Sequence, residues 1–208
     1  RCRSAAPPPR QLYPAHGAEE AVRFGVDVSE YQRGFDFTGF DFAIIRTTDG
    51  TYRDPCFEQL LLDATTAGCD TSTYHFLRAP SEGTTIEQQV EVACEVLVDT
   101  QLPTWLDVES PAGLTLDDVH TAVECFTQAG VEVAGVYTNA WYWRRHMGLA
   151  SPAQFGELWL AHWGDNTVTD PAQLGKWPRP LGFPEPAVWQ FTSRGRVGGI
   201  EVDLNVAR

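Results

Sequence analysis

The sequence predicts an α/β fold: a single irregular TIM-like barrel of the (β/α)5(β)3 kind, with eight strands and helices mainly between the first five to six. Two observations predict it. Up to residue 147, short apolar segments alternate with segments of helical period, as in a parallel sheet with helical crossovers. After residue 147 the apolar segments continue, but stretches rich in Gly, Pro and Asn replace the helical ones. We expect residues 1–21 to be a Pro-rich tail and residues 22–208 to be one domain.

The individual elements follow from local patterns. The first strand alternates apolar and polar residues, and the second is a continuous apolar run, as expected of a strand buried on both faces. Asp54-Pro55 opens a helix that Gly68 ends, and Gly130 ends a later one. The expected strands are residues 24–29, 42–47, 71–76, 102–110, 133–138, 158–162, 187–192 and 200–204, and the expected helices are 54–68, 84–98, 116–129 and 140–147.

Composition limits the classes of partner. The formal net charge of -13 argues against a nucleic-acid partner, because phosphate binding needs a basic surface. No apolar run of about 18 residues is present, so we expect no membrane partner. The cysteines and histidines lack zinc spacing and form no C-x-x-C pair, so we expect no metal and no cofactor. Disulfides, which would suit a secreted protein, and buried free thiols both remain open.

Two acids stand at the end of the fourth expected strand. Asp107 and Glu109 are separated by one residue, so they point to the same face, roughly 7 Å apart at about 3.3 Å rise per residue. A strand end that enters solvent would also explain them. Two carboxylates on one face, however, suit a catalytic site that needs a pair of acids.

The other expected strand ends carry acids and aromatic residues as well. In barrels of this type the working face lies at the C-terminal ends of the strands. Crowded carboxylates raise one another's pKa, so one can act as a general acid while others stabilise positive charge, as glycosidic bond cleavage requires. A divalent cation site is an alternative use of the acids. We predict the catalytic residues Glu109, Asp107, Asp27 and Asp203, and the substrate-binding residues Tyr74, His75, Tyr137, Trp163, Trp189 and Gln190.

On these residues the sequence resembles the family 25 glycoside hydrolases, the Chalaropsis-type lysozymes or N-acetylmuramidases. The resemblance runs in order through Gly25-Val26-Asp27-Val28-Ser29 with Tyr31-Gln32, Phe42-Ala43-Ile44-Ile45-Arg46, Asp49-Gly50, Asp54-Pro55, Tyr74-His75-Phe76, Leu106-Asp107-Val108-Glu109, Val136-Tyr137-Thr138, Leu158-Trp159-Leu160-Ala161-His162, Trp189-Gln190-Phe191-Thr192 and Val202-Asp203-Leu204-Asn205. Two departures concern subsites rather than catalysis. Arg46-Thr47-Thr48-Asp49-Gly50 stands where the family usually has Lys-Ala-Thr/Ser-Glu-Gly, and Tyr31-Gln32 stands where it has Trp-Gln.

The resemblance implies hydrolysis of the β-1,4 bond between N-acetylmuramic acid and N-acetylglucosamine in bacterial peptidoglycan. It implies that Glu109 is the general acid, that Asp107 is the partner carboxylate, that Asp27 and Asp203 are flanking acids, and that Tyr74 and Tyr137 are site tyrosines. Retaining, inverting and substrate-assisted routes through the acetamido group remain open. The expected partner is the glycan strands of peptidoglycan, and the expected oligomeric state is a monomer. The expected location is extracellular, secreted or cell-wall associated, and a phage endolysin would also fit.

Alternative functions stay open too. A barrel that binds peptidoglycan or another glycan without cutting it would need damaged acids, and a cysteine amidase would need a Cys–His pair at a strand exit. Within the expected fold, Cys56 and Cys69 lie at opposite ends of one helix, too far apart for a disulfide. Cys94 and Cys125 lie at similar height on neighbouring helices and are the expected pair. Trp105 is expected in the core, and Trp141, Tyr142 and Trp143 in packing.

Overall fold

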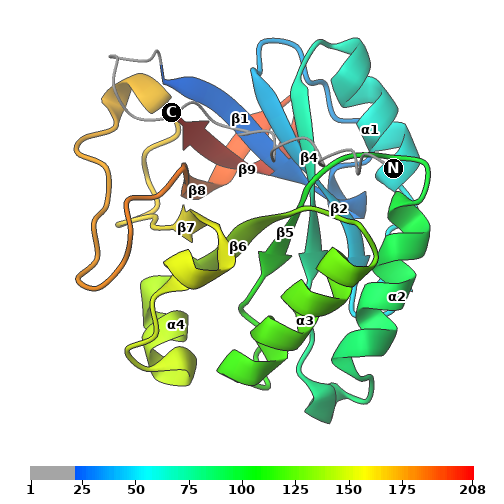
Figure 1. The fold of residues 1–208 in the computed structure, drawn as a ribbon. Helices are drawn as coiled ribbons and strands as arrows, with labels where there is room; N and C mark the ends of the chain where they lie inside the picture. The colour runs from blue at the N-terminus through cyan, green and yellow to red at the C-terminus, as the bar shows by residue number, and fades with distance from the viewer. Residues whose placement is uncertain (1–21) are drawn as a thin grey trace, which may run out of the picture.

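The computed structural model describes residues 22–208, and the expected tail at residues 1–21 lies outside the described part. Strands of the described part form one sheet that curls into a barrel (Figure 1). The strands are β1 (Arg23–Val28), β2 (Phe42–Asp49), β3 (Tyr52–Arg53), β4 (Asp70–Phe76), β5 (Thr104–Asp107), β6 (Val133–Asn139), β7 (Glu157–Ala161), β8 (Val188–Val197) and β9 (Ile200–Ala207). The α-helices are α1 (Phe57–Thr66), α2 (Ile86–Leu97), α3 (Leu116–Gln128) and α4 (Ala140–Met147). The predicted irregular barrel is therefore confirmed.

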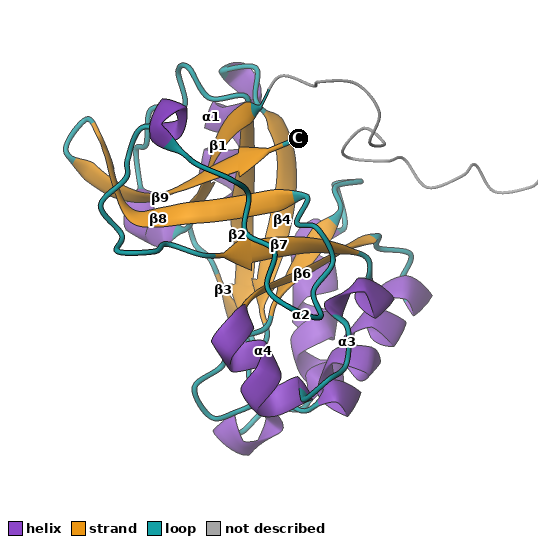
Figure 2. Cartoon of the chain, turned by 90° about the vertical axis from the view of Figure 1, so that its left-hand side faces the viewer, coloured by secondary structure: helices purple, strands orange, loops and turns teal. Residues whose placement is uncertain are grey.

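Strand pairing closes the barrel. The order β1-β9-β8-β7-β6-β5-β4-β2 is completed by parallel pairing of β1 with β2, and the two-residue β3 adds a small hairpin to β2. The last strand differs from the parallel-type prediction, because β9 runs antiparallel to both β8 and β1. The reason is the two-residue connection Gly198-Gly199, whose φ angles are 55° and 85°. Such a turn joins only antiparallel neighbours, and Figure 2 shows β8 and β9 as a long hairpin.

The helices cover only part of the barrel. Helices α1, α2 and α3 pack against the outside of the early strands, whereas the chain after β7 returns largely through loops (Figure 1). Thr85 and Thr115 begin α2 and α3 with capping boxes, in which a threonine and a side chain three residues later bond reciprocally to backbone N–H groups. No helix in residues 22–208 has the length and apolarity needed to cross a bilayer.

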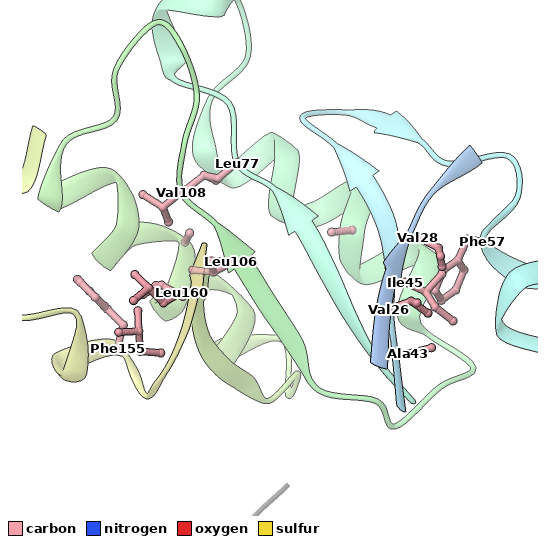
Figure 3. Close-up of a cluster of buried hydrophobic side chains, with 14 of the residues drawn as sticks. Val26, Val28, Ala43, Ile45, Phe57, Leu77, Leu106, Val108, Phe155 and Leu160 are labelled. Carbon is pink, nitrogen blue, oxygen red and sulfur yellow. The ribbon is translucent and has the colours of Figure 1, made fainter. Parts of the chain in front are cut away.

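Side-chain alternation along the strands divides the core into two layers. Ala43 and Ile45 face outward to the helices, in the cluster drawn in Figure 3, while Phe42 and Ile44 face the barrel interior. Trp105 is fully buried in the interior layer, as predicted. The same alternation decides which residues at the strand ends can reach a site inside the barrel mouth.

Two further expectations concern α4 and the cysteines. Tyr142 and Trp143 are buried, so their predicted packing role is confirmed, but Trp141 is 70% exposed. The expected Cys94–Cys125 disulfide is wrong for this structure: the thiols lie near each other on α2 and α3, but both are free, as are Cys56 and Cys69.

Candidate active site

A pocket of about 230 Å³ opens at the barrel mouth, where inward-facing side chains of the strand ends converge. All four predicted acids line it, together with three of the six residues predicted to bind substrate. The lining residues are Asp27, Ser29, Tyr31, Gln32, Arg46, Tyr74, Phe76, Asp107, Glu109, Tyr137, Trp159, Gln190 and Asp203. The pocket therefore combines a carboxyl cluster with aromatic walls.

Asp107 ends β5 and is fixed by backbone bonds to both neighbouring strands. Its carbonyl accepts from Leu77 N–H at 3.1 Å, and Val108 N–H donates to the Tyr137 carbonyl at 2.9 Å. The carboxyl is 5% exposed, and its Oδ1 has no hydrogen-bond partner among the described residues. A buried carboxyl oxygen without a partner is costly, so its placement at the pocket suits a ligand donor.

Glu109 follows Asp107 on the same face and is only partly buried. The next residue, Ser110, is held from two sides. Its hydroxyl donates to Glu82, and its carbonyl accepts from the Tyr142 hydroxyl at 2.8 Å. The β5 exit that carries Glu109 is thus tied to α4 and to the loop before α2, which limits its movement.

Asp27 and Asp203 face each other in register on β1 and β9. Asp27 Oδ2 accepts from Gln190 Nε2 at 2.8 Å and from Asn205 Nδ2 at 2.7 Å, while Gln190 Nε2 also reaches Asp203 Oδ2 at 3.2 Å. Asp203 was predicted at a C-terminal strand end, which is wrong. It reaches the barrel mouth because β9 is antiparallel, which places the first half of β9 there.

Burial raises the pKa of every member of the carboxyl cluster. Burial, followed by the charge of Asp27, raises the pKa of Glu109 to about 7. Burial raises the pKa of Asp27 to about 6, and burial with the charges of Asp27 and Glu109 raises that of Asp203 to about 8. The pKa of Asp107 is also raised, by burial and then by Glu109. The cluster therefore holds exchangeable protons near neutral pH.

Two tyrosines from the prediction, Tyr74 and Tyr137, line the pocket from β4 and β6. Burial raises the pKa of both phenols well above the usual value, so they stay protonated. The Tyr137 hydroxyl donates to Gln190 Oε1 at 2.9 Å. The edge of the Tyr74 ring packs against Trp159, with ring centroids 5.9 Å apart.

The structure does not bring His75 and Trp189 into the pocket, so these two assignments are corrected. Each is the strand neighbour of a pocket residue, and alternation turns it to the opposite face. His75 is fully buried on the helix side, where its Nδ1 lies 2.6 Å from the Thr48 hydroxyl and its ring packs on Phe126. Trp189 donates to the His162 carbonyl and packs outside the barrel.

Trp163 lies beside the pocket rather than in its lining. Its ring is 41% exposed, and its indole N–H donates to Gln190 Oε1 at 3.0 Å. The bond joins the β7 exit to the amide that holds Asp27 and Asp203.

The sequence reasoning missed several lining residues: Ser29, Tyr31, Gln32, Arg46, Phe76 and Trp159. Side-chain alternation could have identified Arg46 and Phe76, because each lies two residues after an inward-facing residue of its strand, Ile44 and Tyr74 respectively. Arg46 donates to Asp54 at 2.9 Å and to Glu30 at 3.0 Å, and its guanidinium lies 5.5 Å from the centre of the Tyr31 ring. It is the cation among the described residues that line the pocket.

The donors around the acids argue against a cation site. Asp27 accepts two amide N–H groups, which occupy lone pairs that a metal ion would need. Within residues 22–208, no group of three or more His, Cys, Asp or Glu side chains is arranged to hold a metal ion. Hydrogen bonding rather than metal coordination accounts for the positions of Asp27 and Asp203.

A TIM-like barrel whose mouth holds two acids on one strand end, one of them able to keep a proton near neutral pH, has the features of a glycosidase. The family model described as glycosyl hydrolases family 25 matches residues 26–200, and the chain belongs to this family. It is therefore a glycoside hydrolase of the lysozyme type.

Two curated relatives and one solved structure illustrate the similarity. Lysozyme M1 of Streptomyces globisporus is 28% identical over 87% of this chain, which spans 65% of that protein's length. A probable GH family 25 lysozyme of Dictyostelium discoideum is also 28% identical, over 87% of this chain and 89% of its own length. A bacterial lysozyme from Streptomyces coelicolor superposes with a TM-score of 0.67 at 28% identity, covering 88% of this chain and 90% of that one.

Proposed function

We propose that this chain is a muramidase that hydrolyses the β-1,4 bond between N-acetylmuramic acid and N-acetylglucosamine in bacterial peptidoglycan. The observation that carries the proposal is the Asp107–Glu109 pair in the barrel-mouth pocket. Family membership and the lysozyme names of the relatives support the reaction and the substrate. The aromatic walls support a sugar ligand, because the C–H faces of sugar rings pack well on tyrosine and tryptophan.

Glu109 is proposed as the general acid. Its pKa of about 7 lets it hold a proton at neutral pH, and its partial exposure lets it meet the glycosidic oxygen. As the bond between the anomeric carbon and that oxygen breaks, Glu109 gives its proton to the leaving sugar. The resulting carboxylate then accepts a proton from the water that completes hydrolysis.

Asp107 is proposed as the partner carboxyl in a substrate-assisted route. Its Oδ1 has no described partner and can accept the acetamido N–H of the sugar. The acetamido oxygen then bonds to the anomeric carbon as the leaving sugar departs, and water later breaks that bond. The buried position of Asp107 suits the steadying of a substrate group better than proton exchange with solvent.

Asp27 and Asp203 are proposed to flank the reacting sugar, with Tyr74, Tyr137 and Gln190 binding it from the pocket wall and Trp163 from the rim. We further propose that residues 22–208 act as one catalytic domain and as a monomer. The substrate places the reaction at the cell wall, and neither nucleic acid nor membrane takes part. A secreted enzyme and a phage endolysin both fit this location.

The Glu109→Gln variant tests the proposal. Glutamine keeps the size and hydrogen-bonding capacity of the side chain but cannot donate the proton, so kcat is expected to fall about 10²–10⁴-fold. Release of reducing ends from purified peptidoglycan measures the rate, and insoluble wall pull-down measures binding. Wild-type protein that binds the wall but releases no reducing ends would favour the alternative, a non-catalytic glycan-binding barrel.

A further inference from the structure

Two buried side-chain amides surround Asp27, and each is bonded on its far side to a tryptophan. Gln190 Nε2 and Asn205 Nδ2 donate to Asp27 Oδ2. Gln190 Oε1 accepts from the indole N–H of Trp163 at 3.0 Å, and Asn205 Oδ1 accepts from that of Trp159 at 2.8 Å. Both amides are buried, at 1% and 0% exposed, so water cannot replace a misdirected bond.

The tryptophans determine which way the amides point. An indole N–H can donate but cannot accept, so the amide atom that faces it must be the oxygen. The amide nitrogen must then face Asp27. If the Gln190 amide were turned over, its NH₂ group would face the Trp163 N–H. Its oxygen would then take the place of Nε2, which lies 2.8 Å from Asp27 Oδ2 and 3.2 Å from Asp203 Oδ2, and would be repelled by both carboxyl oxygens.

Trp163 is the decisive partner for Gln190. The other group at Gln190 Oε1 is the Tyr137 hydroxyl, at 2.9 Å. A hydroxyl can donate or accept, so it would tolerate either orientation of the amide. Of the two groups at Gln190 Oε1, the indole is therefore the one that discriminates between the two amide orientations, and it acts in the same sense as the carboxyl oxygens at Nε2.

We propose that Trp163 and Trp159 are positioning residues whose indole N–H groups lock the Gln190 and Asn205 amides with their donors directed at Asp27. Two N–H donors favour the ionised form of Asp27, and leave Asp203 as the member of the pair that holds the proton. Asp27 and Glu109 line the same pocket, and the charge maintained on Asp27 contributes to the raised pKa of Glu109. The tryptophans thus act on the proton donor through the amides and Asp27.

Other titratable and charged groups act on the same carboxyl cluster. They lie on five of the barrel strands: Arg46 and Asp49 on β2, Tyr74 on β4, Asp107 at the end of β5, Tyr137 on β6, and Glu201 and Asp203 on β9. A Trp163→Phe substitution changes none of them. It keeps one aromatic ring at the rim but removes the N–H donor and the second ring of the indole. The same atoms are lost in Trp189→Phe, so a change in Glu109 titration that is confined to Trp163→Phe reports the loss of the N–H bond to Gln190.

The experiment is a ¹³C-carboxyl NMR titration of Glu109 in the wild type, in Trp163→Phe and in Trp189→Phe. The last is a matched control, because the Trp189 indole donates to the His162 backbone carbonyl and contacts neither amide. In Trp163→Phe the Gln190 amide is free to turn and Asp27 takes up a proton more readily, so the pKa of Glu109 should fall by about 0.5–1 unit. In Trp189→Phe it should stay at the wild-type value.

The side-chain NH₂ signals of Gln190 provide a second measurement, which should move in Trp163→Phe and not in Trp189→Phe. If the pKa of Glu109 is unchanged in a folded Trp163→Phe protein, or changes equally in both variants, the proposal that the Trp163 indole orients the Gln190 amide is refuted. The kinetic consequence rests on the proposed function: the basic limb of kcat/KM should shift to lower pH in Trp163→Phe. Absence of hydrolysis by the wild type would refute the proposed function but leave the titration result standing.

Discussion

At the scale of single residues, the two acids at the β5 exit, Asp107 and Glu109, differ in their exposure to the pocket. Asp107 is 5% exposed, and its Oδ1 has no hydrogen-bond partner within residues 22–208. Glu109 is partly open to the pocket, and Ser110 beside it is bonded to Tyr142 of α4. Carboxyls with unequal access suit unequal roles, one holding a substrate group and one exchanging protons. This difference, rather than their separation, supports the substrate-assisted route.

That route has a stereochemical consequence. Attack by the acetamido oxygen followed by attack of water inverts the anomeric carbon twice, so the new reducing end should first appear with retained β configuration. ¹H NMR of the anomeric protons during the first minutes of hydrolysis measures it. Initial appearance of the α anomer would refute the route and would indicate direct attack of water.

The individual acids were predictable from sequence, but some of their neighbours were not. The spacing of Asp107 and Glu109 placed both on one face, and both line the pocket. His75 and Trp189 were assigned with Tyr74 and Gln190, their immediate neighbours, although a strand presents adjacent residues to opposite faces. If only every second residue of each strand had been assigned to the pocket, His75 and Trp189 would have been left out and Arg46 and Phe76 would have been included.

At the scale of elements, most strands and helices were predictable, because apolar runs, caps and glycine stops are local signals. Helix α4 was expected and observed at residues 140–147. The glycine-rich residues 193–199 have the composition of a hairpin, which indicates an antiparallel last pair, but the expected parallel-type barrel did not include this direction for β9. The tight turn at Gly198-Gly199 sets it. The β3 hairpin was also missed, because two residues are too short to show a period.

The β6–β7 pairing offers an element-scale prediction. At Gly135 an added Cβ would lie 1.9 Å from the Glu157 carbonyl oxygen, a backbone atom that can move only with β7. Gly135→Ala should therefore lower the free energy of unfolding by about 3 kcal/mol or more, measured by urea denaturation. Gly175→Ala, where an added Cβ meets open space, is the control. Equal stability of the two variants would contradict this packing.

At the scale of the whole molecule, the barrel gathers four carboxyl groups in one pocket at its mouth. The chain carries a net charge of -13, and the four acids of the pocket add local repulsion that the fold must offset. Their raised pKa values mean that the folded state holds protons that the unfolded state has released. Linkage then requires stability to fall as pH rises across the window between the unfolded and folded pKa values.

For Asp203 this window runs from its ordinary pKa of 3.8 to about 8. The wild type should therefore be more stable at pH 5 than at pH 8. Asp203→Asn, which carries no charge, should reduce this loss by on the order of 1–3 kcal/mol, measured by urea unfolding at both pH values.

Asp36→Asn is the matched control, because bonds from Thr38 lower the pKa of this exposed aspartate and it is already ionised across the window. It should leave the pH dependence as in the wild type. A wild type whose stability rises from pH 5 to pH 8 would contradict the proton-holding cluster.

A muramidase is defined by the bond that it cuts, and mass spectrometry of digested peptidoglycan identifies that bond most directly. After borohydride reduction, the wild type should yield fragments that end in reduced N-acetylmuramic acid, and Glu109→Gln should yield almost none. Fragments that end in reduced N-acetylglucosamine, or peptides released with intact glycan strands, would contradict the muramidase assignment.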